Sequence, residues 1–187
     1  LKDAQLFCPL EPELAEEVRE WAIKYRLEEA ESYRRILGEK MAHMEVRLAL
    51  EALRTFKPFM IMLDGGFLLF DTFPEWSELV KEAGESGCVL VGVIEEVATS
   101  ELSPRCGLDI PGMCVYDREF LFGLLEPGEV VILGGENAIK RDYYTVFTRM
   151  GSSPQAVACD FLSDQRDMLR SAMDIVFSMT PSQGRGI

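Results

Sequence analysis

One segment constrains the fold of this 187-residue chain more than any other: residues 60–70, with the sequence MIMLDGGFLLF. Two short apolar runs flank Asp64 and two glycines, and Asp-Gly between apolar runs is typical of a tight β-hairpin. We therefore predict two strands, over residues 59–63 and 67–70, joined by this turn. Asp64 would then end a strand on a rigid scaffold, which makes its carboxylate the best candidate for a functional side chain.

The rest of the chain alternates between helical and strand-like patterns of apolar residues. Helices are predicted over residues 13–37 and 39–56 (one long bent helix or a helix pair, separated at Gly38), 72–86, 118–125 capped by Asp117, and 163–179 capped by Ser163. Strands are predicted over residues 88–94, 130–133, 143–148 and 156–161, and a loop over 98–113. Strands that alternate with helices, together with one hairpin, predict an α/β fold in which helices flank a mixed sheet.

The length and the 48% hydrophobic content fit one domain. We expect a helical N-terminal arm over residues 1–38 and an α/β core over residues 39–187. No apolar run approaches the roughly 18 residues of a membrane span, and the chain does not start with a signal-peptide pattern. The five cysteines are scattered without a C-x-x-C pair, which is typical of reduced thiols and predicts a cytoplasmic protein.

The net charge of −13 argues against broad, salt-driven binding to nucleic acid, which needs lysines and arginines on one face. It leaves open a local group of carboxylates that holds a divalent cation. The chain has a single histidine, His43, and this composition argues against a zinc site of the usual kind. Helical spacing predicts that His43 faces solvent.

Two carboxylates are the main candidates for such a site. Asp64 is either a turn residue that binds its own backbone or a metal ligand at the end of a strand. On a helical wheel centred on Leu48, at about 100° per residue, Glu45 falls inside the apolar stripe. A carboxylate there needs a partner, which is either an arginine, solvent reached by an extended side chain, or a cation.

Glu45 and Asp64 together suggest a shared site, since the helix ends just before the strand that carries Asp64. Converging carboxylates repel unless a cation lies between them, and Mg²⁺ or Mn²⁺ can support phosphodiester cleavage by activating water. Weaker candidates are Glu95 and Glu96, for which a solvated strand end is favoured, and Asp160, for which a turn residue is favoured.

A helix that carries an inward-facing glutamate, followed by a strand ending in Asp64-Gly-Gly-Phe-Leu, resembles the NurA family of DNA-repair nucleases. The likeness extends over most of the chain from about residue 39. It implies a ribonuclease H-like fold, Mn²⁺ (or Mg²⁺) bound by Asp64 and Glu45 as the catalytic pair, and degradation of DNA ends by metal-activated water. It also implies a ring-shaped homodimer that works with a hexameric HerA-type helicase.

The chain departs from the family pattern at several points. An earlier Asp-Gly-Ser strand and a late histidine have no counterpart in the 187 residues, Gly66 replaces a serine, and Glu95-Glu96 replaces a lysine. We therefore expect a NurA-like domain that lacks the family's N- and C-terminal elements. Two hypotheses follow: a metal-dependent DNA nuclease, or a catalytically inactive NurA-like module that dimerises or docks on a helicase-type partner.

Overall fold

A computed structural model describes residues 7, 11–108, 112 and 114–180. Two compact units are present: the first comprises Leu1–Lys57 and Leu68–Lys81, the second Pro58–Phe67 and Glu82–Ile187. Each unit is described by itself below.

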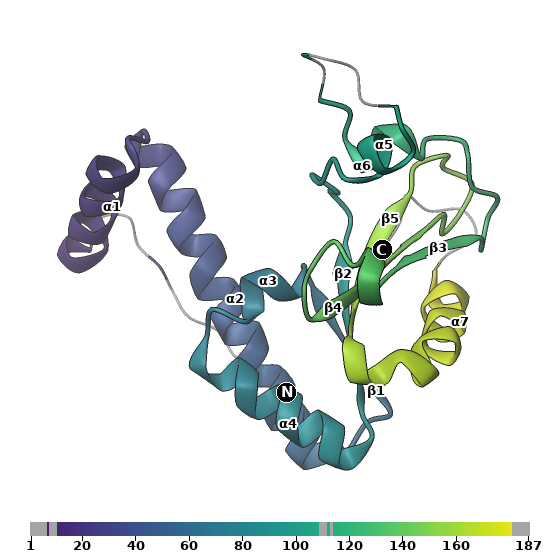
Figure 1. Cartoon of the computed structure of the whole chain (residues 1–187). Helices are drawn as coiled ribbons and strands as arrows, with labels where there is room; N and C mark the ends of the chain where they lie inside the picture. The colour runs from purple at the N-terminus through teal and green to yellow at the C-terminus, as the bar shows by residue number, and fades with distance from the viewer. Residues whose placement is uncertain (1–6, 8–10, 109–111, 113, 181–187) are drawn as a thin grey trace. The chain divides into compact units, whose positions relative to one another are not determined.

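The first unit contains α1 (Pro12–Tyr25), α2 (Glu29–Phe56) and most of α4 (Pro74–Ser86). Figure 1 shows α1 folded back beside the first turns of α2. Leu14 and Val18 of α1 are buried against Ile36 of α2, and the rings of Trp21 and Tyr33 pack onto this small core. Apolar residues at helical spacing therefore form a packed helix pair, which is one of the two arrangements predicted from the sequence.

The break between these helices lies at residues 26–28, so its predicted position at Gly38 is wrong. Arg26 has a left-handed backbone with a φ of 55°, which ends the helical hydrogen-bond ladder after Tyr25. Gly38 lies within α2, where an added Cβ would meet nothing within 4 Å. An exposed glycine costs a helix only about 1 kcal/mol, which the long packed helix tolerates.

Side chains of α2 bind α4 and the residue just before it. His43 Nε2 lies 2.9 Å from Glu75 Oε2, and the imidazole stacks on the ring of Phe73 at 4.9 Å. Arg54 donates to Glu78 at 2.6 Å. His43 was expected to face solvent, but these contacts leave its side chain only 40% exposed.

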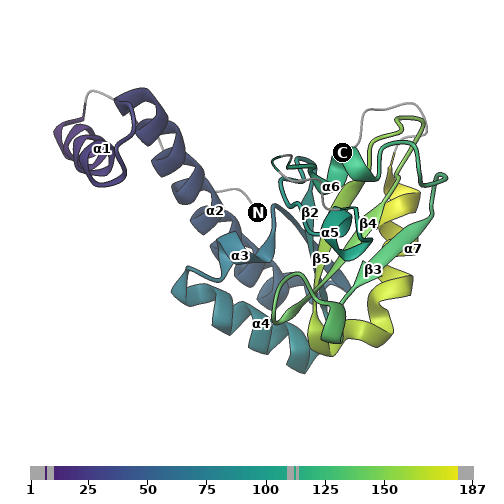
Figure 2. The same cartoon turned by 45° about the horizontal axis from the view of Figure 1, so that its top comes forward.

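The second unit is built on a five-stranded sheet with the order β1-β2-β5-β4-β3 (Figures 1 and 2). The strands are β1 (Met60–Asp64), β2 (Val89–Ile94), β3 (Val130–Leu133), β4 (Tyr143–Thr148) and β5 (Val157–Leu162). β1 and β2 are parallel and the other neighbours are antiparallel. The predicted mixed sheet is confirmed, with strand bounds within one residue of those expected after residue 87.

The predicted hairpin at Asp64 is wrong. Phe67–Phe70 forms the short helix α3, and β1 pairs in parallel with β2, so that Asp64 lies opposite Val93. Parallel pairing needs a crossover, which α4 supplies. Phe67 and Phe70 are both fully buried, and a four-residue apolar run has too little period to separate a helix turn from a strand.

Helices flank both faces of the sheet. On one face α7 (Leu169–Met179) buries Ala172, Met173 and Val176 against the valines of β2 and the middle of β5. On the other face lie residues around α5 (Leu102–Arg105) and α6 (Asp117–Phe120). Side chains alternate along a strand, so Cys159 faces α7, whereas Asp160 faces the opposite side.

Three local predictions in this unit need correction. The helix expected over residues 118–125 is the single turn α6, and Asp117 is not its cap but a buried acceptor for Thr99 Oγ1 at 2.6 Å and Leu102 N at 2.7 Å. Ser163 does not cap the last helix, which starts as the 3₁₀ segment η2 (Ser163–Met168). The expected loop over residues 98–113 contains α5, and its residues 109–111 and 113 lie outside the described part.

Candidate functional site

Asp64 is the last residue of β1 and its side chain is exposed. It lies opposite Val93, the penultimate residue of β2, so it stands where the carboxyl ends of the two parallel strands meet. This edge of an α/β sheet is a frequent location for binding sites, because rigid strands present side chains and loops there.

The turn after Asp64 folds closely over β2. A Cβ on Gly92 would lie 2.5 Å from the Gly65 carbonyl oxygen and 2.9 Å from the ring of Phe67. Gly65 has a φ of 146°, a conformation that side chains disfavour. The two glycines at positions 65 and 92 therefore allow this backbone path, and the path places Asp64.

Below the turn lies a buried ion pair. Asp160 of β5 is fully buried, and its Oδ2 accepts hydrogen bonds from Lys140 Nζ and, at 3.0 Å, from the backbone N–H of Phe67. Its other oxygen accepts from Thr145 Oγ1 at 3.0 Å. The lysine neutralises the carboxylate and three donors satisfy its oxygens, which is the condition for a charge to be stable in a core.

Glu45 lies at the margin of the buried stripe of α2 and is half-buried. The stripe is not centred on Leu48 as predicted, since its buried members are Ala42, Val46, Ala49, Leu50 and Leu53. Exposed fractions of 61% for Met41 and 64% for Phe56 rule these two residues out of the stripe. Glu45 and Asp64 belong to different units, so their pairing stays a prediction.

The weaker candidates divide clearly. Glu95 and Glu96 are exposed just after β2, which agrees with a solvated strand end. Asp160 is no turn residue, since it lies within β5 with every oxygen satisfied. Among the described residues, no group of three or more His, Cys, Asp or Glu side chains is placed to hold a metal ion.

Thiol chemistry finds no support at this site. Cys88 and Cys159 are buried and free, and burial raises the thiol pKa of Cys88 to about 11. Burial, assisted by the charge of Asp160, raises the pKa of Cys159 to about 12. Both thiols are protonated at neutral pH and are poor nucleophiles. Cys106 and Cys114 are free and exposed, as the predicted reduced state requires, and Cys8 lies outside the described residues.

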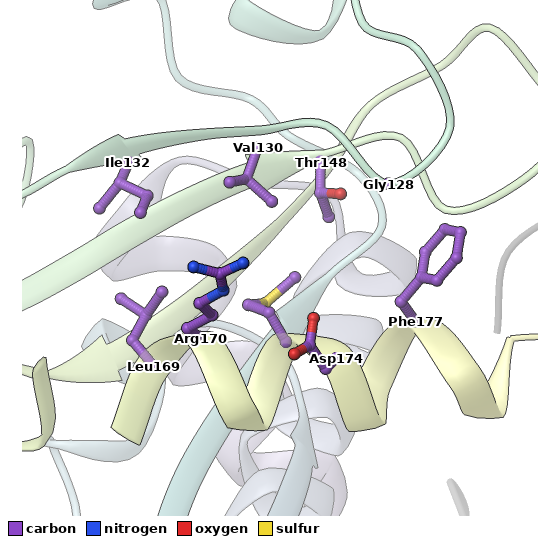
Figure 3. A pocket seen from close by; sticks show the side chains of 9 residues that line it. Gly128, Val130, Ile132, Thr148, Leu169, Arg170, Asp174 and Phe177 are labelled. Carbon is purple, nitrogen blue, oxygen red and sulfur yellow. The ribbon is translucent and has the colours of Figure 1, made fainter. Parts of the chain in front are cut away.

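A groove of about 540 Å³ lies between α7 and β3, the edge strand on the other side of the sheet from β1. Figure 3 shows Val130 and Ile132 on the strand side, and Arg170, Asp174 and Phe177 projecting from the helix. Its walls are mainly apolar, and β3 is separated from β1 by three strands. The groove is therefore distinct from the turn that carries Asp64.

Three residues that shape the turn were not predicted from the sequence: Gly92, Lys140 and Thr145. Gly92 did carry a signal, because a glycine inside the strand-forming run Val-Leu-Val-Gly-Val-Ile often marks the close approach of another backbone. Lys140 precedes β4 by three residues and has no distinguishing pattern around it. Thr145 is an ordinary strand residue, and its role follows only from its position opposite Asp160.

The fold and the turn define a mixed α/β domain with a carboxylate at the carboxyl end of a parallel strand pair. The model of the NurA domain matches residues 5–187, so the chain belongs to the NurA family and the resemblance drawn from its sequence is confirmed. This membership indicates a nuclease-related function, in a family whose nucleases are generally metal-dependent. No curated protein and no solved structure matches the chain. No described helix is both long and apolar enough to span a membrane.

Proposed function

We propose that this chain is a metal-dependent DNA nuclease that hydrolyses phosphodiester bonds at DNA ends during repair. Membership of the NurA family supports this reaction class. The observation that carries the proposal is the placement of Asp64, whose exposed carboxylate lies at the carboxyl ends of β1 and β2. The turn that follows Asp64 packs so closely on β2 that position 92 has no room for a side chain.

Asp64 and Glu45 are the residues that would supply carboxylate oxygens to Mn²⁺ or Mg²⁺, both of which prefer such ligands. A bound cation would supply an activated water and stabilise the leaving oxygen. Asp160 does not fit a ligand role, because Lys140, Thr145 and the Phe67 amide already occupy its oxygens. For such a cation to bind, the surrounding residues must also hold the Asp64 carboxylate in one orientation.

The finer features of this proposal come from the family resemblance. They are a ribonuclease H-like arrangement of the mixed sheet, a preference for Mn²⁺, a homodimer and a HerA-type helicase as partner. A cytoplasmic location is also proposed, and the free thiols of Cys88, Cys106, Cys114 and Cys159 agree with it.

Cleavage of end-labelled linear DNA tests the central proposal. With MnCl₂ present, the wild-type chain should degrade the DNA, and Asp64→Asn and Glu45→Gln should each lower the rate at least 100-fold. Asp167→Asn and Glu51→Gln remove exposed carboxylates of the same types and should leave the rate unchanged. Full activity of the Asp64→Asn protein would refute the role given to this residue.

The second candidate is a catalytically inactive module that dimerises or docks on a helicase-type partner. The ion pair of Lys140 with Asp160 favours it, because a lysine holds the buried carboxylate that accepts from the turn at Phe67. So do the exposed apolar side chains of α1, Ile23 at 81% and Tyr25 at 47%. Light scattering that shows an obligate dimer, together with calorimetry that shows no Mn²⁺ binding, would support this candidate over the nuclease.

A further inference from the structure

The buried carboxylate of Asp160 connects three segments that are far apart in the sequence. Its partners are Phe67 in the turn after β1, Lys140 before β4, and Thr145 within β4. The lysine side chain is itself 9% exposed, and Asp160 is not exposed at all. Such a pair stabilises a fold poorly compared with apolar side chains of similar size, so its presence calls for another explanation.

The pair is directed at the turn that carries Asp64. A Cβ on Gly66 would lie 3.1 Å from Asp160 Oδ2 and 3.3 Å from Lys140 Nζ, so both charged groups lie next to this glycine of the turn. Phe67 is fully buried, and its amide donates to Asp160 Oδ2 at 3.0 Å. The ring of Phe67 meets Tyr143, at the start of β4, edge to face at 5.2 Å.

We propose that Asp160 is a positioning residue: with Lys140 neutralising it, it clamps residues 65–67 and thereby fixes the orientation of the Asp64 side chain. The importance of that orientation for metal binding rests on the proposed function. The clamp itself does not, since it concerns only the conformation of the turn. The energetic basis is that a buried amide without an acceptor is costly, so the turn stays where the carboxylate can accept from it.

Two sets of substitutions separate the clamp from the ion pair. Asp160→Asn with Lys140→Met removes both charges, but the Asn oxygen can still accept from the Phe67 amide and its NH₂ can donate to Thr145. Asp160→Leu with Lys140→Met and Thr145→Val also removes both charges and fills a similar volume, but it takes away the acceptor that residue 160 offers to the Phe67 amide. Circular dichroism and unfolding midpoints establish that both proteins are folded.

Nuclear magnetic resonance can test the conformation of residues 65–67 in the absence of any metal. Amide exchange of Phe67 should be as slow in the Asn variant as in the wild type, and at least 10-fold faster in the Leu variant. The χ1 couplings of Asp64 should report one rotamer in the first two proteins and averaging in the third. Slow Phe67 exchange in the Leu variant, or loss of protection in both variants, would overturn the clamp.

The dissociation constant for Mn²⁺, measured by electron paramagnetic resonance, then tests whether the conformation of the turn affects metal binding at Asp64. It should stay within about twofold of the wild-type value in the Asn variant and rise at least 10-fold in the Leu variant. Equal affinities in the two variants would overturn the role of Asp160 in positioning Asp64 for a ligand. If the wild type binds no Mn²⁺, the proposed function fails, whereas the exchange rates and couplings still decide the clamp.

Discussion

Gly92 and Gly65 approach so closely that a Cβ on Gly92 would lie 2.5 Å from the carbonyl oxygen of Gly65. The turn after Asp64 can therefore cross β2 only where that strand has no side chain. This contact lies at the carboxyl ends of β1 and β2. The exposed carboxylate of Asp64, the last residue of β1, is next to it.

Gly92→Ala should destabilise the protein by about 2–3 kcal/mol, since the new methyl group must displace backbone and not a flexible side chain. The free energy of unfolding in urea measures the loss. Gly38→Ala is the matched control: an added Cβ there meets nothing within 4 Å, and alanine should stabilise α2 by about 0.5–1 kcal/mol. Equal effects of the two substitutions would contradict the packing of the turn over β2.

Asp117→Ala should cost about 3 kcal/mol, because it removes the acceptor of both the Thr99 hydroxyl and the Leu102 amide in a buried site. Asp117→Asn should cost less, as its oxygen can still accept from Leu102 and its NH₂ can donate to Thr99. The melting temperatures of the three proteins should therefore fall from the wild type to the Asn variant and again to the Ala variant. Asn and Ala variants of equal stability would show that these hydrogen bonds contribute nothing.

The contact between His43 and Glu75 should make stability depend on pH. The hydrogen bond from His43 holds the pKa of Glu75 below its usual 4.5, so the folded state favours the charged form. This contribution is complete above pH 4.5 and disappears as the pH falls through the lower folded-state pKa. The stability difference between wild type and Glu75→Gln should therefore shrink below pH 4.5, as urea titrations at pH 7, 5, 4 and 3 would measure.

Glu126→Gln provides the control for that titration, because it removes an exposed carboxylate outside the His43 contact. Its stability difference from the wild type should not follow the same trend with pH. A Glu75→Gln difference that stays constant from pH 7 to pH 3 would mean that the His43 contact does not form in solution.

The thiols should separate into two classes towards an aromatic disulfide reagent at pH 8. In a Cys8→Ser background, Cys106 and Cys114 should react within minutes, since both are exposed. Cys88 and Cys159 should react only on unfolding, because burial raises their pKa to about 11 and about 12. Four fast thiols in the native protein would contradict the burial of β2 and β5.

Much of the second unit was predictable from local patterns. The runs Val130–Leu133 and Tyr143–Thr148 are strands with the expected bounds, because β-branched and aromatic residues between turn residues favour extended backbone. In the first unit, α4 also forms close to its expected bounds, with Pro74 as its first residue. These signals lie within a few residues, so a single sequence contains them.

The errors occur where burial overrides local preference. Asp64-Gly-Gly-Phe predicts a hairpin, but β1 pairs with β2 and Phe67 begins the short helix α3, where it is fully buried. Asp160 looks like a turn residue and is instead the buried partner of Lys140, 20 residues away. Such pairings depend on which strands become neighbours, and no local period encodes that choice.

Residue types and short spacings were enough to predict the family and the α/β class, and they also suggested the two carboxylates that we propose as metal ligands. The tertiary structure alone decided that Asp64 ends a parallel strand, that Gly92 makes room for its turn, and that Asp160 holds the Phe67 amide. The physical reason is that a buried charge and a close backbone contact are satisfied only by partners brought together when the sheet assembles.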